Sequence, residues 1–206
     1  MTRLLIATTN PAKLGEYRRL LRDFALEAIS LRDVGIENQP PETGASFAEN
    51  AMLKARHYFE RSRLATLADD GGLEIDALGG EPGVRSHRWL GDAAGGDRAL
   101  VAEVIRRMGN VEENRRTARL RNALALVYRA GGEVRERVVE GVLGGIIPRS
   151  AYPTITPGFP YRSVLFLPER GCYLAELSEE EQARLSQRRI AVERARAYLL
   201  EIAAAG

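Results

Sequence analysis

The chain opens with a short apolar run typical of a strand and continues with apolar residues at helical spacing. This order limits the folds that it can adopt. Leu4 to Ala7 is a short apolar run of the kind that forms a buried strand, and Thr8 to Pro11 follow it directly. In that segment Asn10 can cap a helix, and Pro11 suits the first helical position. Apolar residues then recur at helical spacing from Leu14 to Leu21. A strand that leads straight into a helix is typical of an α/β protein.

The alternation continues through the first half of the chain. Residues 46–49 read Ser-Phe-Ala-Glu, a capping box that predicts the start of a second helix at Ser46. Leu64 to Ala68 then form an apolar run that ends in Asp69, Asp70, Gly71 and Gly72. From Leu73 to Leu78 apolar and acidic residues alternate, as in a half-exposed strand. We therefore expect the two aspartates at the end of a buried strand.

Helices and strands remain mixed in the second half. Apolar spacing from Leu100 to Met108 predicts a helix. Two strand-like runs, Ala118 to Tyr128 and Val134 to Ile147, flank the pair Gly131-Gly132 and predict a long hairpin that forms a second lobe. A strand at Val164 to Leu167 and two closing helices follow, the first capped by Ser178 with Glu181. The expected class is α/β with a mixed sheet.

Composition narrows the kind of protein. A chain of 206 residues is one large domain or two small lobes, and 45% apolar with 28% charged residues is ordinary for a globular protein. A net charge of only +2 argues against a nucleic-acid surface. The four apolar residues after Met1, Thr2 and Arg3 are too few for a secretory core or a membrane span. The single cysteine, Cys172, fits a reducing compartment, so we expect a cytoplasmic protein.

The first candidate site is the junction between the opening strand and its helix. Free backbone N–H groups and the helix dipole make such a helix start attractive to phosphate. Thr8, Thr9 and Asn10 lie at this junction, and Lys13 follows one turn into the helix. A lysine here can neutralise a phosphate. The alternative is a solvated lysine on a capped helix, which the junction alone favours.

The second candidate is a set of carboxylates. Mg²⁺ prefers one or two protein carboxylates together with phosphates and waters, and Glu42, Asp69 and Asp70 offer such oxygens. Neighbouring side chains of an extended segment point to opposite faces, so only one of the two aspartates should reach a metal. The alternative is a plain turn, because Asp-Asp-Gly-Gly is common in turns. Lys54, one helical turn after Asn50, could face a polyanion, a carboxylate or solvent.

Other polar and aromatic residues allow two interpretations each. Phe159 and Tyr161 form a proline-bounded aromatic turn on which a purine could stack, or they pack in the core. Neither His57 nor His87 has a partner at metal-ligand spacing, so neither receives a catalytic role. The remaining residues either contact a ligand or form ordinary polar surface: Arg85, Arg88, Gln182, Gln187 and Arg188.

The order and spacing of these segments resemble the inosine/xanthosine triphosphate pyrophosphatase family over nearly the full chain. The opening strand with Thr-x-Asn-x-x-Lys-x-x-Glu matches residues 8–16. A second block is longer and more specific. It comprises Glu42-Thr43-Gly44-x-Ser46-Phe47-x-x-Asn50-Ala51-x-x-Lys54-Ala55, then Ala68-Asp69-Asp70-x-Gly72-Leu73, and Asp76-Ala77-Leu78-Gly79-Gly80-x-Pro82-Gly83. Four later segments follow in the family's order: Arg88-x-x-Gly91, Glu140-Gly141, Gly158-Phe159-x-Tyr161, and Ala175-Glu176-Leu177-Ser178 with Ser186-x-Arg188.

The resemblance implies a fold and an activity. The fold is a long mixed β-sheet between two α/β lobes with a central nucleotide cleft, so residues 1–206 form one two-lobed domain, usually in a homodimer. The activity is Mg²⁺-dependent hydrolysis of inosine, deoxyinosine or xanthosine triphosphate to the monophosphate and pyrophosphate, with Mn²⁺ as a possible substitute. Asp70 resembles the catalytic carboxylate and Glu42 its magnesium partner, while Lys13 stabilises the charge on pyrophosphate. The implied substrate contacts are Thr8, Thr9, Asn10, Lys13, Asn50, Lys54, Gly71, Phe159, Pro160, Tyr161, Arg162, Gln182, Gln187 and Arg188.

The departures from the family pattern concern the base. Arg162 stands where the family has an aspartate, Gln182 replaces a lysine, and Gln187 replaces a histidine. Gly71 replaces a serine after the two acids. Two alternatives to the family activity stay open: a related Maf-like pyrophosphatase for pyrimidine or modified nucleotides, and a nucleotide-binding sensor with weak or no catalysis.

Overall fold

The computed structural model describes residues 1–91 and 96–205 and contains a seven-stranded mixed sheet. The strands lie in the order β2-β1-β3-β4-β5-β6-β7. Strand β1 is parallel to β2 and β3, whereas β6 is antiparallel to β5 and β7, which confirms a mixed sheet. The strands are β1 Thr2–Ile6, β2 Leu26–Ser30, β3 Ala65–Ile75, β4 Thr117–Ala130, β5 Glu133–Ile146, β6 Phe166–Leu167 and β7 Cys172–Tyr173.

The helices begin where the capping residues predict. Asn10 caps α1 with Pro11 at its first position, and Ser46 caps α2 by accepting a hydrogen bond from Glu49 N. The capping box of Ser178 and Glu181 opens α4. The α-helices are α1 Pro11–Leu20, α2 Phe47–Ser62, α3 Gly96–Arg107, α4 Glu179–Leu185, α5 Gln187–Arg194 and α6 Arg196–Ala204. Short 3₁₀ helices cover Arg32–Val34, Asp76–Leu78, Gly83–Arg85, Glu113–Arg115, Pro160–Ser163 and Leu174–Glu176.

The chain divides into two compact units, each made of several segments. The first unit comprises Met1–Asp70, Asn122–Gly141 and Gln187–Gly206, and the second comprises Gly71–Arg121 and Val142–Ser186. Strands β3, β4 and β5 therefore each contribute to both units. The prediction that the β4–β5 hairpin forms a second lobe was wrong, because its turn at Gly131 and Gly132 belongs to the first unit.

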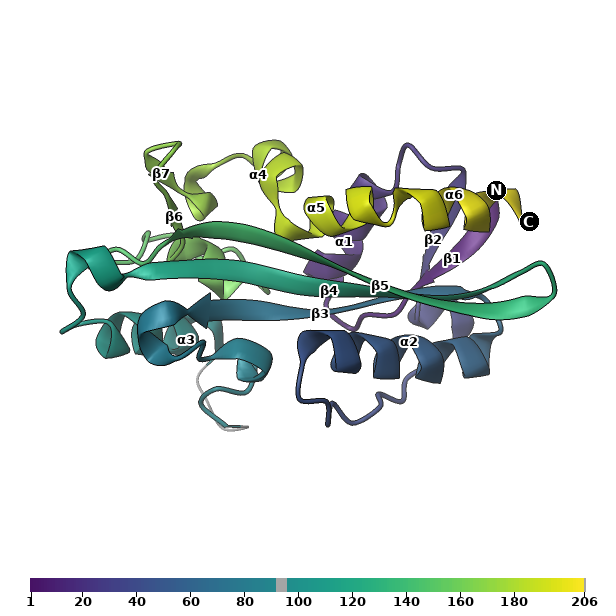
Figure 1. Ribbon diagram of the computed structural model, residues 1–206, viewed down its shortest axis with the longest axis horizontal. Helices are drawn as coiled ribbons and strands as arrows, with labels where there is room; N and C mark the ends of the chain where they lie inside the picture. Colours follow the sequence, from purple (N-terminus) through teal and green to yellow (C-terminus); the bar gives the residue numbers. More distant parts are fainter. Residues whose placement is uncertain (92–95, 206) are drawn as a thin grey trace. The chain divides into compact units, whose positions relative to one another are not determined.

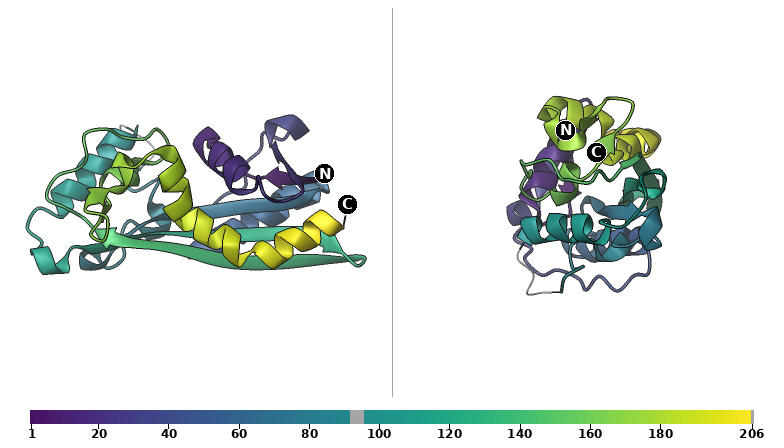
Figure 2. Two further views of the ribbon diagram at one scale, coloured as in Figure 1. Left: turned by 90° about the horizontal axis from the view of Figure 1, so that it is seen from above. Right: turned by 90° about the vertical axis from the view of Figure 1, so that its left-hand side faces the viewer.

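The first unit packs helices on both faces of its strands (Figure 1). Helices α1, α5 and α6 share a core with β1 and β4, in which Tyr17, Leu124, Tyr128 and Leu199 are at most marginally exposed. Helix α2 lies on the opposite face and buries its own apolar stripe, including Phe47. Figure 2 shows α5 and α6 following one another along the β4–β5 hairpin.

The second unit has its own core and one buried arginine that the sequence did not reveal. Helix α3 contributes Leu100 and Val104 to this core. Arg116 is 1% exposed, and its guanidinium donates to four backbone carbonyls. These carbonyls belong to Met108, Val111, Ile147 and Pro148. The hydrogen bonds offset the desolvation of the buried charge and tie the end of α3 to the end of β5.

Three sequence expectations about elements were wrong. Residues 69–72 do not form a turn but lie inside the 11-residue strand β3, which ends at Ile75. Gly72 is needed because a Cβ there would lie 1.9 Å from Ser86 Oγ, so the glycine permits close packing rather than a turn. Val164 and Leu165 precede the strand β6 instead of forming it. The chain closes with three α-helices, not two, since α5 ends at Arg194 and α6 begins at Arg196.

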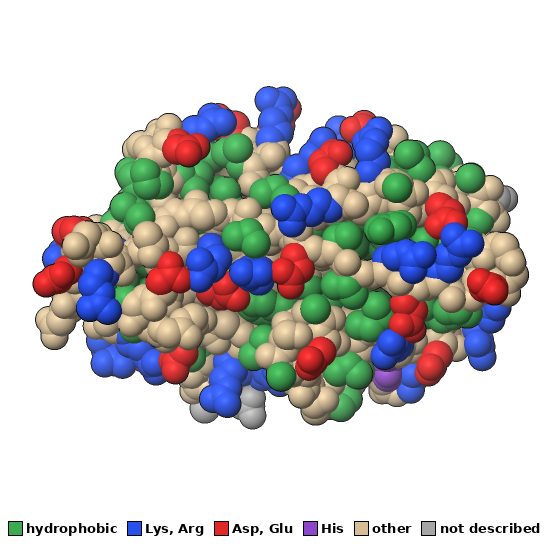
Figure 3. Space-filling model, in the orientation of Figure 1, with side chains coloured by type: hydrophobic (Ala, Val, Ile, Leu, Met, Phe, Trp, Pro, Cys, Tyr) green, Lys and Arg blue, Asp and Glu red, His purple; other side chains and the backbone are tan. Residues whose placement is uncertain are grey.

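Charges on the surface are mostly balanced locally. Arg119 bonds both Glu74 and Asp76, and Arg56 on α2 pairs with Glu136 on β5 at 2.6 Å. On the face that Figure 3 shows, basic and acidic side chains are interspersed. Within residues 1–91 and 96–205, no helix combines the length and the hydropathy that a membrane crossing needs.

We predict that Gly141→Ala destabilises the protein. A Cβ at this position of β5 would lie 1.8 Å from Gln187 O and 2.8 Å from Ala191 N, both backbone atoms of α5. Such overpacking costs about 1–3 kcal/mol or more, because α5 must move. Urea unfolding measures the effect. Gly144→Ala on the same strand is the control, since its Cβ meets nothing within 4 Å, and equal stability of the two variants would contradict the account.

Candidate active site

The start of α1 is organised by its cap. Asn10 Oδ1 accepts hydrogen bonds from Ala12 N at 2.9 Å and Lys13 N at 3.3 Å, while Thr8 Oγ1 accepts from Asn10 N at 3.2 Å. The expectation of free backbone N–H groups at this helix start was therefore wrong for Asn10, Ala12 and Lys13, whose N–H groups all donate hydrogen bonds. What this end offers an anion is the helix dipole, the threonine hydroxyls and the Lys13 ammonium.

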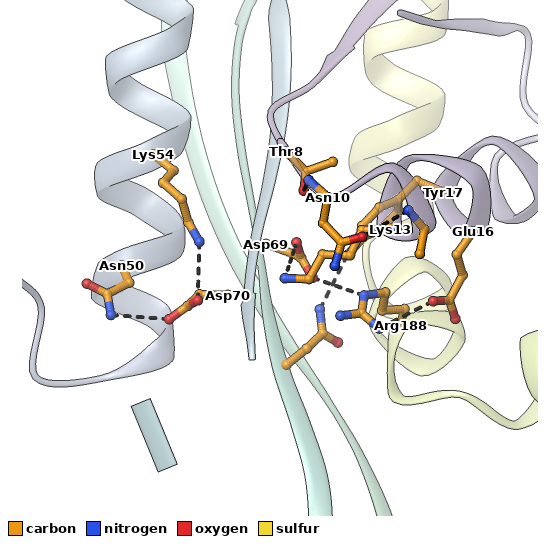
Figure 4. Close-up of polar contacts among 12 residues, drawn as sticks. Thr8, Asn10, Lys13, Glu16, Tyr17, Asn50, Lys54, Asp69, Asp70 and Arg188 are labelled. Atoms are coloured by element: carbon orange, nitrogen blue, oxygen red, sulfur yellow. Dashed lines mark hydrogen bonds and ion pairs between the residues drawn. The ribbon is translucent and has the colours of Figure 1, made fainter. Parts of the chain in front are cut away.

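Two neighbouring carboxylates of β3 point to opposite sides of the strand (Figure 4). Asp69 faces α1 and α5, where it contacts Lys13 and Arg188. Asp70 faces α2, where it contacts Asn50 and Lys54. This is the alternation expected of an extended segment, and it keeps two adjacent negative charges apart.

On the Asp69 side, four charged groups form a buried chain. Lys13 Nζ lies 3.2 Å from Asp69 Oδ1, and Arg188 Nε donates to Asp69 Oδ2 at 3.0 Å. Arg188 NH1 continues to Glu16 Oε2 at 3.3 Å. All four residues are at most 6% exposed. Two cations and two anions balance here, which is what permits their burial between α1, β3 and α5.

Within this buried group of four charged residues, the neighbouring charges favour the charged forms of Asp69 and Arg188. Burial raises the pKa of Asp69, but Lys13, Arg188 and Lys54 outweigh it and hold the pKa well below its ordinary value. Burial opposes the charge on Arg188, yet Asp69 and Glu16 raise its pKa. Burial lowers the pKa of Lys13, although Asp69 partly compensates. Asp69 therefore stays an anion between two cations.

On the Asp70 side, Lys54 joins two carboxylates. Its Nζ lies 2.9 Å from Glu42 Oε1 and 3.2 Å from Asp70 Oδ1. The Lys54 side chain is 13% exposed and that of Asp70 is 8% exposed, whereas Glu42 is 34% exposed and reaches the solvent edge. Of the three sequence alternatives for Lys54, contact with carboxylates is the one that the structure shows.

Asn50 positions both Asp70 and the loop that carries Glu42. Its Nδ2 donates to Asp70 Oδ2 at 3.2 Å, and its Oδ1 accepts from Gly44 N at 2.8 Å. Gly44 has to be glycine because a Cβ would lie 2.7 Å from Asn50 Oδ1. The spacing of Glu42, Gly44, Asn50 and Lys54 along the sequence thus corresponds to one connected arrangement around Asp70.

The acids and the lysine of this group shift one another's proton affinity. Burial raises the pKa of Asp70, and the charge of Glu42 raises it further against the effect of Lys54. Burial opposes the charge on Lys54, but Asp70, Asp69 and Glu42 outweigh it and raise its pKa. The neighbouring carboxylates therefore favour the charged form of Lys54, while Glu42 and Asp70 repel each other and attract positive charge.

The donor set on this side fits Mg²⁺. Within the described parts of the chain, no cluster of three or more His, Cys, Asp or Glu side chains is arranged as a metal site. Two hard carboxylate oxygens, Glu42 Oε1 and Asp70 Oδ1, approach one ammonium group. Two carboxylates suit Mg²⁺, which usually completes its octahedron with phosphate oxygens and waters.

Five of the six expected substrate contacts in the second unit lie within residues 159–182. Phe159 is half-buried, and the Arg162 guanidinium lies 3.8 Å from its ring centroid. Arg162 NH1 donates to Gln182 Oε1 at 2.8 Å, and Gln182 in turn donates to Leu177 O. Tyr161 packs in the core and donates its hydroxyl to Ser86 O, so core packing is the correct interpretation for Tyr161. The fifth is Pro160, which is buried at the start of the 3₁₀ helix.

The remaining expected contacts divide between the units. Gln187 and Arg188 begin α5, which belongs to the first unit. The same unit contains Thr8, Thr9, Asn10, Lys13, Asn50 and Lys54. The buried Gln187 Oε1 has no hydrogen-bond partner in the described residues. Gly71 continues β3 into the second unit. The structure thus brings the expected phosphate and metal residues into one unit and leaves most of the base-recognition residues in the other.

Sequence reasoning did not assign a role to Glu16, Tyr17 or Asn122. All three belong to the buried polar group near Arg188, where Asn122 Nδ2 donates to Tyr17 OH at 3.3 Å. A signal was present, because Lys13, Glu16, Tyr17 and Leu20 have helical spacing along one face of α1. Charged residues on a buried stripe predict paired internal charges.

Comparisons with known proteins identify the family of the chain. The sequence profile of the Ham1 family matches residues 4–198. The dITP/XTP pyrophosphatase of Escherichia coli (strain K12) is 38% identical over 189 residues, which are 91% of this chain and 93% of that protein.

Solved structures show the same fold. A HAM1 protein from Coxiella burnetii superposes with a TM-score of 0.84 at 32% identity, covering 98% of this chain and all of the other. The nucleoside-triphosphatase / dITP/XTP pyrophosphatase from Mycobacterium abscessus gives a TM-score of 0.72 at 37% identity, covering 94% of this chain and 97% of the other.

We predict that Arg188→Met destabilises the protein by about 3–5 kcal/mol, because it leaves Asp69 and Glu16 buried without their shared cation. Arg189→Met is the matched control. Arg189 is the next residue, its side chain is 37% exposed and it pairs with Glu193, so its loss should cost less than about 1 kcal/mol. Chemical denaturation of both variants measures the difference. Equal losses would show that the buried chain does not stabilise the fold.

Proposed function

The chain belongs to the Ham1 family, and on this basis we propose that it hydrolyses purine nucleoside triphosphates with unusual bases to the monophosphate and pyrophosphate. The substrates are inosine, deoxyinosine and xanthosine triphosphates, in line with the relatives named dITP/XTP pyrophosphatases. The protein is accordingly a hydrolase of nucleotide metabolism.

The observation that carries the proposal is the convergence of Glu42 and Asp70. Their oxygens approach within 2.9 and 3.2 Å of one ammonium group, so they can share a cation. Asn50 holds the second oxygen of Asp70, while Oδ1 faces Lys54. A pair of carboxylates of which one is largely buried is suited to bind metal and to direct a water molecule.

In this proposal Glu42 and Asp70 hold Mg²⁺, with Mn²⁺ as a possible substitute. The metal, when bound, neutralises charge on phosphate oxygens. Asp70 orients the water that attacks the linkage between the α and β phosphates. Lys13 donates to the pyrophosphate that leaves, because an ammonium has three N–H groups and Asp69 accepts one of them. Thr8, Thr9, Asn10 and Lys54 contribute further donors to the triphosphate.

The base is assigned to residues near Arg162. Phe159 offers an aromatic surface, and Gln182 fixes the direction of the Arg162 guanidinium. We also propose that both units belong to one nucleotide-binding domain. The nucleotide cleft and the homodimer that the resemblance implies stay predictions, as does a cytoplasmic location.

We predict that Asp70→Asn lowers kcat by about 10²–10⁴-fold with little change in stability, because the amide keeps the shape but loses the charge that binds metal and orients water. Asp69→Asn should reduce activity less and stability more, since Asp69 faces Lys13 and Arg188 instead. A pyrophosphate-release assay with inosine triphosphate and Mg²⁺ gives kcat, and thermal melting gives stability.

Three outcomes would contradict the assignment. Undiminished pyrophosphate release by Asp70→Asn would remove Asp70 from catalysis. A wild-type protein that binds inosine triphosphate without turnover would be a sensor, and one that prefers pyrimidine or methylated triphosphates would act like a Maf-like enzyme.

We predict a preference for xanthosine triphosphate over guanosine triphosphate. Arg162 can only donate hydrogen bonds, so the group of the base that faces it has to be an acceptor, such as O2 of xanthine. A mismatch costs about 1–3 kcal/mol, or roughly ten- to a hundredfold in selectivity.

Values of kcat/KM for inosine, xanthosine, guanosine and adenosine triphosphates test this, with Arg162→Asp as the informative variant. Arg184→Asp makes the same charge change on α4, at an exposed side chain, and should leave the profile unaltered. A strong preference for inosine triphosphate that Arg162→Asp does not change would show that Arg162 does not face the base.

A further inference from the structure

We propose that Lys54 competes with the divalent cation for Glu42 and Asp70, so that metal binds tightly only together with a triphosphate that accepts the Lys54 ammonium. The inference rests on the proposed function, because it takes these two carboxylates as the metal ligands. It adds a role for Lys54 beyond contact with phosphate, namely coupling of metal binding to nucleotide binding.

The geometry gives Lys54 the oxygens that a metal needs. Its Nζ lies 2.9 Å from Glu42 Oε1 and 3.2 Å from Asp70 Oδ1. Asp70 Oδ2 already accepts a hydrogen bond from Asn50, so Oδ1 is the oxygen for which ammonium and metal compete. Figure 4 shows Lys54 and Asn50 reaching Asp70 from the same helix, α2.

The position of the ammonium is well defined. The Lys54 side chain is 13% exposed, and its stem rises from the middle of α2, between the buried residues Ala51 and Ala55. The neighbouring residue Arg56 points elsewhere, since it bonds Glu136 on β5 at 2.6 Å. Lys54 is thus the basic residue of this helix that faces the carboxylate pair.

Charge balance makes the competition strong. Glu42 and Asp70 together carry a charge of −2. The Lys54 ammonium reduces the net charge of the group to −1. A divalent cation held by Glu42 and Asp70 would lie close to that ammonium, and like charges a few ångströms apart in a partly buried site repel strongly. Metal therefore binds at this pair only at a penalty while Lys54 stays in place.

A triphosphate removes the penalty. Its oxygens provide negative charge for both cations, so Lys54 can turn from the carboxylates to a phosphate while the metal binds carboxylates and phosphates together. Each ligand then favours the binding of the other, and the coupling is reciprocal. The protein would keep its metal site largely closed to free Mg²⁺ until substrate arrives.

Mn²⁺ binding to the nucleotide-free protein, followed by electron paramagnetic resonance, tests the proposal without any turnover. Lys54→Met keeps the apolar stem but removes the charge, and should bind Mn²⁺ about tenfold more tightly than wild type or better. Lys54→Arg keeps the charge and should bind weakly, as wild type does. Arg56→Met is the matched control, because it removes a cation from the same helix without touching the pair, and its Kd should not change.

Thermal melting provides a second readout. Without Lys54 the two carboxylates repel each other, so Lys54→Met should melt below wild type and regain stability when Mg²⁺ is added, by more than wild type gains. If Lys54→Met does not fold, Lys54→Gln replaces it in both measurements. Equal or weaker Mn²⁺ binding by the neutral variant, or no detectable binding by either protein, would overturn the inference.

A parallel titration separates this inference from the proposed function. With the non-hydrolysable inosine α,β-imido-triphosphate present, wild type should bind Mn²⁺ tightly, and the gain over the nucleotide-free protein should be smaller for Lys54→Met. Failure of wild type to bind Mn²⁺ even with the analogue would remove Glu42 and Asp70 as metal ligands and so contradict the proposed function itself. Tight Mn²⁺ binding by wild type both with and without the analogue would overturn only the role of Lys54.

Discussion

The structure of the site depends on one constraint, the alternation of side chains along β3. Asp69 and Asp70 are adjacent in sequence, and the strand directs them to opposite sides. Asp69 faces Lys13 and Arg188, while Asp70 faces Lys54. If residues 69–72 formed a turn, both carboxylates could lie on one side, where their repulsion would need different partners. The extended backbone therefore gives Asp69 and Asp70 separate partners on the two sides of the strand.

Buried ion pairs connect the helices and the strand around Asp69. Arg188 on α5 bonds Asp69 on β3 and Glu16 on α1, so one guanidinium connects three elements. Because the loss of any member leaves an unpaired charge in the interior, the group is stable only as a whole. On the other side, Asn50 connects the Glu42 loop to Asp70 through Gly44. The Asp69 side of β3 thus has balanced charges, whereas on the Asp70 side two carboxylates face one ammonium group.

Features that depend on a few neighbouring residues, such as helix caps, could be predicted from the sequence. Contacts between residues far apart in the sequence could not. The caps at Asn10, Ser46 and Ser178 follow from side-chain hydrogen bonds within one turn, and the structure confirms them. The strand through Asp69 and Asp70 was harder to predict, because Gly72 is required by Ser86 rather than by a turn. Partners far apart in sequence could not be read from spacing, as with Glu16 and Arg188 or with the carbonyls around Arg116. The roles of the site residues in binding and catalysis remain predictions.

The central claim is that the Asp70 side of β3 directs water to the α phosphate of a triphosphate. The most direct test is ³¹P nuclear magnetic resonance of the products formed from inosine triphosphate and Mg²⁺ in ¹⁸O-labelled water. We expect unlabelled pyrophosphate and a monophosphate whose resonance carries the ¹⁸O isotope shift. Orthophosphate and inosine diphosphate, or label in the pyrophosphate, would mean attack at another phosphorus atom and would contradict the central claim.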